Sequence, residues 1–427
     1  MTTSVRQTRV GLSQLLAVLV TIVGAVAAWR ALQPSLNAPL PTLANQSEER
    51  MQDFRDALYF PIREFLGGGN PYDPAAMFAH WPVRQDFNLY QPYHLVLHLP
   101  FALPGYRVGA VAFAVVSLLL LVLLAFMAAS RVRLRVPFPI LVGTGGLAAL
   151  LLTSQVGKAQ LYVGQVNPLV AAGAAGALML RGSHPRWAAV ALAVAWLKPQ
   201  FGLPLAVLLF ARGSRRVVLT GTAIAAAASL PVVVLLTLRG GGIGAFLDVI
   251  AANLDHARST SYGAVDSLTA QRIDLPAVLF RVTGWVAPAA ELIALVVVLA
   301  ASAVLVRRLD RVGAPDTSAI ADLLTGLAVV VAVVHQPGDV LITFPSMAVA
   351  AAVWWQRRSQ PGWRPLGWTI LVLAVPYAHL HVVDSLIASV LGARAAVTVD
   401  GVAVVMCWII VLGFAYRLLR TPERVRL

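Results

Sequence analysis

Long uncharged apolar runs dominate this sequence and constrain its fold more than any other feature. Val10–Trp29 and Val108–Ser130 are two such runs, and each meets the roughly 20 residues that a helix needs to cross the hydrocarbon core of a bilayer. Inside a bilayer only helices and closed barrels satisfy every backbone polar group, and these runs are too long for barrel strands. The sequence therefore predicts an all-α, polytopic membrane protein with about twelve spans.

The charge composition also indicates a membrane protein. Only 12% of the residues are charged and 59% are hydrophobic, whereas soluble domains carry roughly 25% charged residues. A net charge of +14 would suggest nucleic-acid binding in a soluble protein. Here the arginines gather in short connections between apolar runs and in a C-terminal tail that includes Arg424 and Arg426, which is the positive-inside pattern. We therefore expect no nucleic-acid partner. The single cysteine, Cys407, excludes an intrachain disulfide.

Placing the basic connections in the cytoplasm orients the whole chain. The cytoplasmic segments then hold most of the 33 lysine and arginine residues. The first helix, about 10–33, is interpreted as a retained anchor, because its apolar stretch is longer than that of a signal peptide. Segment 34–105 becomes the first extracytoplasmic loop, 239–275 the second large one, and Gly157–Asn167 a shorter one. We expect a single transmembrane domain, 1–427, in the cell membrane.

The first outer loop is expected to contain interfacial helices. Apolar residues recur at helical spacing within 52–66, with charged residues between them, and such a helix lies in the plane of the membrane interface. Pro61 should kink or divide it. The run His94–Leu103 is too short to span a bilayer, so we interpret it as a second interfacial or re-entrant segment.

Asp53 and Asp56 are the candidate chemical groups of the first interfacial helix. Three residues apart on an α-helix, they share a face. A carboxylate at a membrane interface can act as a general base toward a hydroxyl. The alternative is a solvated polar face in which Arg55 and Arg63 pair with the two carboxylates.

Lys198 and His335 interrupt otherwise apolar sequence. Lys198 divides the run 187–211 into two half-spans; an intramembrane charge suggests a functional site, and a compact cation suits a phosphate. His335 follows the uncharged run Leu323–Val334 and can donate to a phosphate or stabilise a leaving group. The alternatives are a snorkelling lysine at a helix end and a hydrogen-bonded histidine in a loop.

Two further outer segments carry polar groups suited to a sugar or a phosphate. Gln165 and Asn167 lie in a tight turn that enters a helix, and their amides can donate and accept hydrogen bonds. Arg258 and Asp266 lie in the second large outer loop. The alternatives are ordinary helix-start chemistry for the turn and a solvated surface for the loop.

The sequence lacks the patterns that bind nucleotides. It has no Walker loop and no Rossmann glycine fingerprint, and no Asp-x-Asp pair of the kind that often holds a metal with a nucleotide sugar. No cofactor and no metal site is predicted, and the metal requirement stays open. For a membrane transferase without a nucleotide site, a lipid-linked donor is the simpler expectation.

Several polar motifs of the outer segments occur in a distinctive order. They are Asp53-Phe54 with Tyr59, Gly68-x-Asn70-Pro71-Tyr72, Tyr90-x-Pro92, Gly164–Asn167, Leu197–Pro199 and the segment headed by His335. In order and spacing, over nearly the whole chain, the sequence resembles glycosyltransferase family 87. That family contains polyprenyl-phosphate-mannose-dependent α-mannosyltransferases and related arabinofuranosyltransferases of cell envelopes.

This resemblance implies a GT-C fold with an extracytoplasmic active site, a polyprenyl-phosphate-sugar donor and inversion at the anomeric carbon. The acceptor is expected to be a glycolipid or an envelope glycan. Family logic makes Asp53 the base, and the donor phosphate or leaving group is expected to contact Lys198, His335 and Arg258. The sugar or acceptor is expected to contact Asp56, Asn70, Tyr72, Tyr90, Gln165, Asn167 and Asp266. Two departures from the family pattern are Gln91 within the Tyr-x-Pro element and Asp266 where relatives often have an Asn-Gln-Ser sequence.

Two alternatives to a mannosyltransferase remain at this point. One is an arabinofuranosyltransferase of the same family. The other is a transporter or flippase of lipid-linked sugars, which would place its polar site near the bilayer midplane and often within inverted repeats. No repeat is evident in the sequence, and the depth of the polar cluster distinguishes the two classes.

Overall fold

The computed structural model describes residues 2–269, 272–379 and 381–420. Over these residues the chain is helical, with no strand, which confirms the all-α prediction. Arg424 and Arg426 of the expected basic tail lie outside the described residues. The long helical segments are α1 (Thr2–Leu36), α6 (Tyr106–Val132), α12 (Arg215–Arg239), α15 (Ala290–Val312), α16 (Pro315–Ala332), η3 (Pro337–Thr343) continued by α17 (Phe344–Arg357), and α22 (Val399–Arg420).

Within the described residues, seven helical segments are long and apolar enough to cross a membrane, or up to nine if each of two bent pairs is one span. The chain is therefore a multi-pass membrane protein. The first bent pair is α7 (Ile140–Thr153) with α8 (Gln155–Val163), at 69°. The second comprises η4 (Pro361–Trp363), α18 (Arg364–Leu373), α19 (Val375–Ala378) and α20 (His381–Leu391), with α21 (Ala393–Ala396) following it.

The expected interruption at Lys198 is confirmed. The run divides into two short apolar helices, α10 (Pro185–Ala195) and α11 (Pro199–Ala211), next to α9 (Asn167–Leu180). The outer loop predicted for Gly157–Asn167 is wrong over most of its length, because that segment belongs to α8. The polar residues of this segment suggested a loop rather than a helix. The helix is terminated by Gly164, which has a left-handed conformation with φ of 73°.

Short helices gather at one end of the molecule, which we call the α13 end. They are η1 (Leu43–Asn45), the π-helical segment η2 (Phe54–Tyr59), α2 (Phe60–Leu66), α3 (Pro74–His80), α4 (His94–Leu97), α5 (Leu99–Ala102) and α13 (Ile243–Ser259). The short helix α14 (Leu275–Thr283) packs against α15 and α22 instead. The two helical segments expected within the first loop are present. Most of 239–275 was expected to be a loop, but α13 occupies its first half. This helix is amphipathic, with Phe246 and Ala257 buried and Asp248 and Asp255 exposed.

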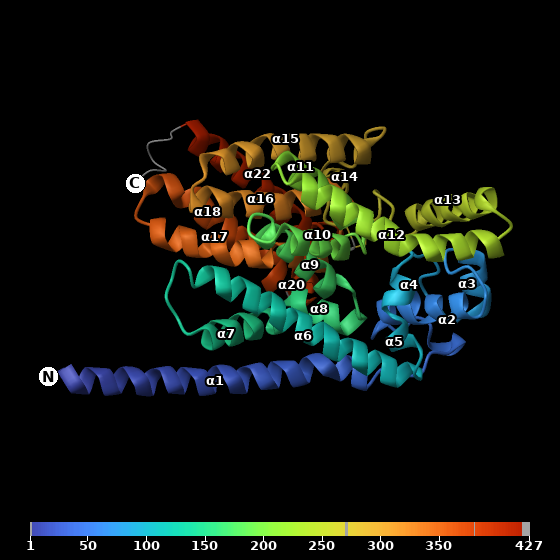
Figure 1. Ribbon diagram of the computed structural model, residues 1–427, viewed down its shortest axis with the longest axis horizontal. Helices are drawn as coiled ribbons and strands as arrows, with labels where there is room; N and C mark the ends of the chain where they lie inside the picture. Colours follow the sequence, from blue (N-terminus) through green and yellow to red (C-terminus); the bar gives the residue numbers. More distant parts are fainter. Residues whose placement is uncertain (1, 270–271, 380, 421–427) are drawn as a thin grey trace.

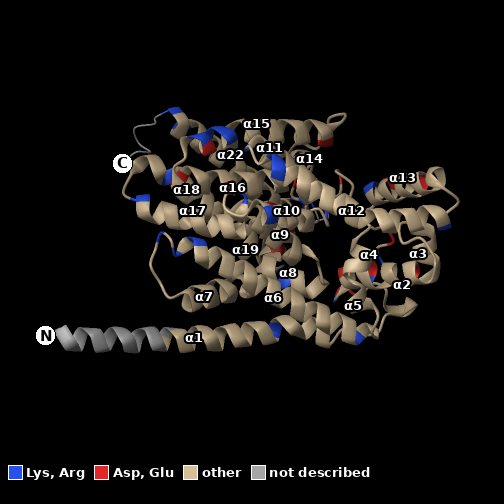
Figure 2. Cartoon of the chain, in the orientation of Figure 1, with Lys and Arg blue, Asp and Glu red and all other residues tan. Residues whose placement is uncertain are grey.

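The opposite end of the molecule carries most of the arginines, and we call it the basic end. Figure 1 shows the long helices running side by side between the two ends, with the start of α1 and the end of α22 at the basic end. Figure 2 shows many arginine positions grouped there. The buried Arg212 anchors this end by pairing with Asp310 and Asp322, each at 2.8 Å. The charge distribution agrees with the predicted clustering of arginines in helix connections.

Candidate active site

A cavity of about 280 Å³ lies between the α13 end and the long helices. Helix ends and connections supply its polar lining, which consists of Asp53, Gln85, Tyr90, Gln165, Lys198, Gln200, Arg258, Tyr262, Glu291, Gln336 and Asp339. Phe87, Leu89 and Leu254 contribute apolar surface. A small set of polar groups within an apolar wall is typical of sites for organic ligands.

Asp53 and Asp56 do not share a face, contrary to the sequence-based expectation. Asp53 lines the cavity and keeps part of its surface accessible, whereas Asp56 is 1% exposed. The Asp56 carboxylate pairs with Arg55 at 2.6 Å and accepts hydrogen bonds from the backbone N–H groups of Arg84 and Gln85. The segment between the two aspartates is π-helical, and the wider π turn changes the angular spacing of side chains. Asp56 therefore anchors the 84–85 segment, while Asp53 remains available in the cavity.

The surroundings of Asp53 suit a general base. Burial raises the pKa of its carboxyl to about 6, against an ordinary value of 3.8, and the negative charges of Asp56 and Asp339 act in the same direction. The positive charge of Lys198 and a hydrogen bond from Gln165 oppose this rise. A carboxylate with this pKa is ionised at neutral pH and more basic than an exposed aspartate, so it can accept a proton from a hydroxyl.

A chain of hydrogen-bonded side-chain amides orients Gln165, which donates the hydrogen bond to Asp53. Asn167 donates through Nδ2 to Asp339 Oδ1 at 2.7 Å and also to Gln165 Oε1. Gln165 in turn donates through Nε2 to Gln336 Oε1 at 3.0 Å. Because an ionised carboxylate only accepts, Asp339 determines which way the Asn167 amide faces. That orientation commits the Gln165 carbonyl to Asn167 and leaves its amino group facing Asp53 and Gln336.

Lys198 and Tyr90 meet on another wall of the cavity. Lys198 precedes α11, is 6% exposed, and its Nζ lies 5.4 Å from the centroid of the Tyr90 ring. A backbone hydrogen bond of 3.0 Å from Gln91 N to Leu197 O holds the two segments together. The hydroxyl of Tyr72 donates to the Tyr90 carbonyl at 2.9 Å and supports the segment from behind. The cation is thus held near Asp53 by contacts between segments far apart in the sequence.

Comparison with known proteins identifies the family. The profile of glycosyltransferase family 87 matches residues 88–337, which is more than half of the chain. The chain belongs to glycosyltransferase family 87. This confirms the family expected from the motifs and makes the protein a glycosyltransferase. No curated protein and no solved structure matches the chain.

In this family 87 glycosyltransferase, His335 lies behind the cavity wall. The side chain is fully buried, its ring centroid is 4.5 Å from that of Phe201, and its neighbours Val334 and Gln336 line the cavity instead. Burial lowers the pKa of His335, which favours the neutral ring. Its Nδ1 lies 3.0 Å from the carbonyl oxygen of Val333 and is therefore the protonated nitrogen. The remaining Nε2 is then an acceptor, and it would need a proton before it could donate to a phosphate.

The other expected sugar and phosphate contacts of the family 87 chain divide into two groups. Arg258 lines the cavity with a side chain that is 71% exposed and pairs with Asp255 at 3.7 Å. Asn70 accepts a hydrogen bond from the backbone N–H of Tyr72 and, like Tyr72, does not line the cavity. Asp266 is exposed and also lies outside the lining.

Sequence reasoning missed several polar groups of the cavity. Gln336 and Asp339 follow His335 in its segment but were not chosen as site residues, and neither was Glu291. The structure shows that Asp339 organises the amide chain and that Glu291 pairs with Arg272 at 2.9 Å. The signal that could have identified Asp339 is a carboxylate that follows the candidate His335 within the same polar segment. Within the described chain, no group of three or more His, Cys, Asp or Glu residues is arranged to hold a metal ion.

Proposed function

We propose that this family 87 glycosyltransferase has a GT-C fold of about twelve spans and transfers a sugar, most simply mannose, from a polyprenyl phosphate to a hydroxyl group. The acceptor is a glycolipid or a cell-envelope glycan, and the reaction takes place at the extracytoplasmic face of the cell membrane. The supporting observation is that Asp53 and Lys198 line one cavity, a candidate base and a candidate phosphate contact within reach of one small ligand.

The proposed reaction is a single displacement with inversion. The acceptor oxygen attacks the anomeric carbon of the donor while its proton passes to the Asp53 carboxylate. The bond between that carbon and the phosphate oxygen breaks, and its electron pair stays on the leaving polyprenyl phosphate. The growing negative charge on the phosphate is stabilised by Lys198, with Arg258 at the cavity rim. His335 has a supporting part, because its ring packs behind the wall that Gln336 forms.

The other residues expected at the site either contact the ligands directly or support the residues that do. Tyr90 and Gln165 line the cavity and are assigned to the sugar or the acceptor. Asn167 acts through Gln165. Asn70, Tyr72 and Asp56 hold the loop that carries Tyr90 and Gln85. An exposed Asp266 is assigned to a large acceptor that extends beyond the cavity.

Two alternatives are distinguished by different observations. An arabinofuranosyltransferase would use the same base and the same phosphate contacts, so only the donor separates it from a mannosyltransferase. A flippase would need its polar groups near the middle of the bundle. The lining residues instead come from helix ends and connections beside the α13 end, which favours a transferase.

The test is sugar transfer by the purified chain. Radiolabelled polyprenyl-phosphate-mannose and polyprenyl-phosphate-arabinose are each supplied with a lipid extract as acceptor. Wild type is compared with Asp53→Asn and with Asp248→Asn, a matched control that removes an exposed carboxylate of α13 outside the cavity lining. We expect transfer from one donor, its loss in Asp53→Asn and its retention in Asp248→Asn.

Each other outcome contradicts a defined part of the proposal. Transfer that persists in folded Asp53→Asn moves the base to another group. Loss in both variants assigns the effect to general charge rather than to the cavity. If neither donor supports transfer while labelled lipid crosses a vesicle membrane that contains the protein, the flippase alternative replaces the transferase.

A further inference from the structure

A second and larger cavity, of about 620 Å³, lies at the basic end, away from Asp53. It is enclosed by the end of α6, the end of α9, the start of α16 and one face of α17. No residue is shared between its lining and that of the candidate active site. The proposed transfer reaction therefore gives this cavity no role.

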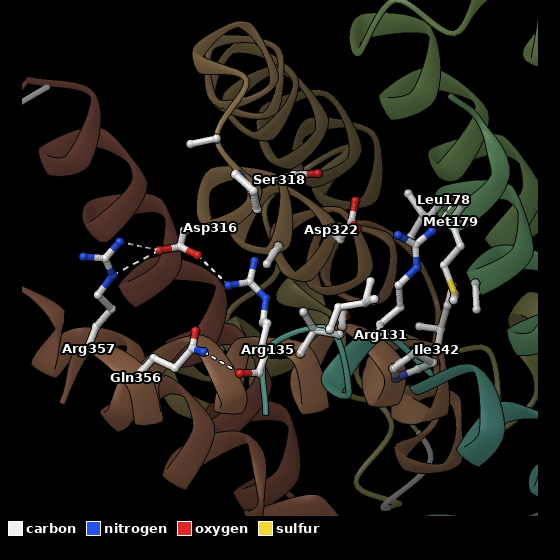
Figure 3. A pocket seen from close by; sticks show the side chains of 18 residues that line it. Arg131, Arg135, Leu178, Met179, Asp316, Ser318, Asp322, Ile342, Gln356 and Arg357 are labelled. Carbon is white, nitrogen blue, oxygen red and sulfur yellow. Dashed lines mark hydrogen bonds and ion pairs between the residues drawn. The ribbon is translucent and has the colours of Figure 1, made fainter. Parts of the chain in front are cut away.

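Three arginines and two aspartates line this cavity. Figure 3 shows Arg135 and Arg357 reaching Asp316 from two sides, and both ion pairs are formed. Arg131 lies apart from these pairs, beside Leu178 and Met179, and donates to the backbone carbonyl of Met179.

The neighbouring ion pairs leave a positive excess. Asp322, which also lines the cavity, pairs with the buried Arg212. Arg212 shares Asp310 with Arg181. The residues that line the cavity and the residues joined to them by these ion pairs include five arginines and three aspartates. The arginines are at positions 131, 135, 181, 212 and 357, and the aspartates are at positions 310, 316 and 322. Partly buried cations in a membrane protein are normally paired, so this excess favours a bound anion.

Much of the remaining lining is apolar and follows α17 away from Arg357. Ile342, Pro345 and Val349 line the cavity from the first half of this segment, and Arg357 lines it from the last turn. Leu178 adds apolar surface from α9. A ligand that fits both parts has an anionic head and an apolar body. The cavity volume lies within the roughly 300–1,000 Å³ of small-molecule sites.

We propose that this cavity binds the phosphodiester headgroup and the adjoining acyl chain of an anionic phospholipid. Arg131 contacts the phosphate, and the apolar lining of α17 receives the start of the chain. Basic pockets between transmembrane helices at the cytoplasmic side are known to bind anionic lipid headgroups. The basic end of this chain is the one that the positive-inside rule assigns to that side.

The test measures lipid binding by the purified full-length chain in detergent. Phosphatidylglycerol, phosphatidylcholine or inorganic phosphate is added, and we record the melting temperature and the lipids retained in native mass spectrometry. We expect phosphatidylglycerol alone to be retained and to raise the melting temperature. Arg131→Ala should weaken its binding about tenfold, as the loss of one charge-assisted hydrogen bond predicts.

The matched control is Arg133→Ala, which removes the same charge from an exposed residue two positions away and outside the lining. Ser318→Glu is the second variant: it places a negative charge in the cavity without removing any arginine, so it decides the question if Arg131→Ala does not fold. Both cavity variants should bind phosphatidylglycerol more weakly than wild type does, and Arg133→Ala should bind it equally well.

Three results would overturn the proposal. Equal retention of phosphatidylcholine would remove the requirement for an anion. The same effect with inorganic phosphate alone would make the site one for a free anion rather than a lipid. Equal weakening in Arg131→Ala and Arg133→Ala would assign the binding to surface charge. None of these results depends on glycosyl transfer, so the lipid site and the proposed reaction can fail separately.

Discussion

The sharpest prediction concerns the pH dependence of the transferase and its control by Lys198. If Asp53 takes the proton of the acceptor, only its ionised form is active. Burial raises the pKa of this carboxyl to about 6. Activity should therefore be lost as the pH falls through about 6, more than one unit above the range of an ordinary aspartate.

The size of this effect follows from a single ionisation. With a pKa of about 6, the base is almost fully ionised at about pH 7.5 and only about one-tenth ionised at about pH 5, so kcat/KM should fall about tenfold between them. An aspartate with the ordinary value of 3.8 would keep nearly all of its activity over this interval. The charge of Lys198 lowers the pKa of Asp53, so Lys198→Gln should move the acid limb of the profile to higher pH.

The assay is kcat/KM for the labelled donor, measured between about pH 4.5 and pH 8.5, where its profile reports the free enzyme. The chain offers a matched control in its other lysine, Lys158, which is exposed on α8. Lys158→Gln should leave the acid limb unchanged. The reasoning is refuted if wild type keeps full activity at pH 5, or if the two lysine variants shift the limb equally.

Three further predictions test the site and the fold. Asn167→Ala removes the partner that orients the Gln165 amide toward Asp53. We therefore expect kcat/KM to fall about tenfold and the acid limb of the pH profile to move to higher pH. An unchanged pH profile would leave Asn167 a purely structural role. Gly164→Ala forces a side chain into a left-handed position with φ of 73° and places its Cβ 2.8 Å from the Cβ of Phe54, so thermal melting should show a loss greater than the about 1–2 kcal/mol of the backbone strain alone. Arg212→Leu removes the buried partner of Asp322 and one of the two arginines that pair with Asp310, which should cost about 1.5–3 kcal/mol, whereas exposed Arg216→Leu should melt like wild type.

The helical class and the family could be predicted from the sequence because both rest on local patterns. An apolar run long enough to span a bilayer must be helical, whatever it packs against. The break at Lys198 was visible for the same reason, since a charge and a proline interrupt an apolar run. Helices without an uninterrupted apolar run were missed: α8 and α13 carry polar residues on one side, and hydropathy alone suggested loops.

The cavity is a product of tertiary structure, because distant segments form it. The contact of Gln91 with Leu197 brings Tyr90 to Lys198, and the contact of Asn167 with Asp339 creates the amide chain. Hydropathy and motif order contain no information about such long-range pairs.

The sequence by itself determined that the chain is an all-helical membrane protein, that it resembles family 87, and that Asp53 is a candidate base. Only the tertiary structure showed that Asp53 lines the cavity while Asp56, one π-helical turn away, does not. It also showed that Asp339 organises the site. The physical reason is that membrane insertion depends on the summed hydropathy of one segment. The pKa and the partners of a carboxylate depend instead on which groups the fold brings within hydrogen-bonding distance.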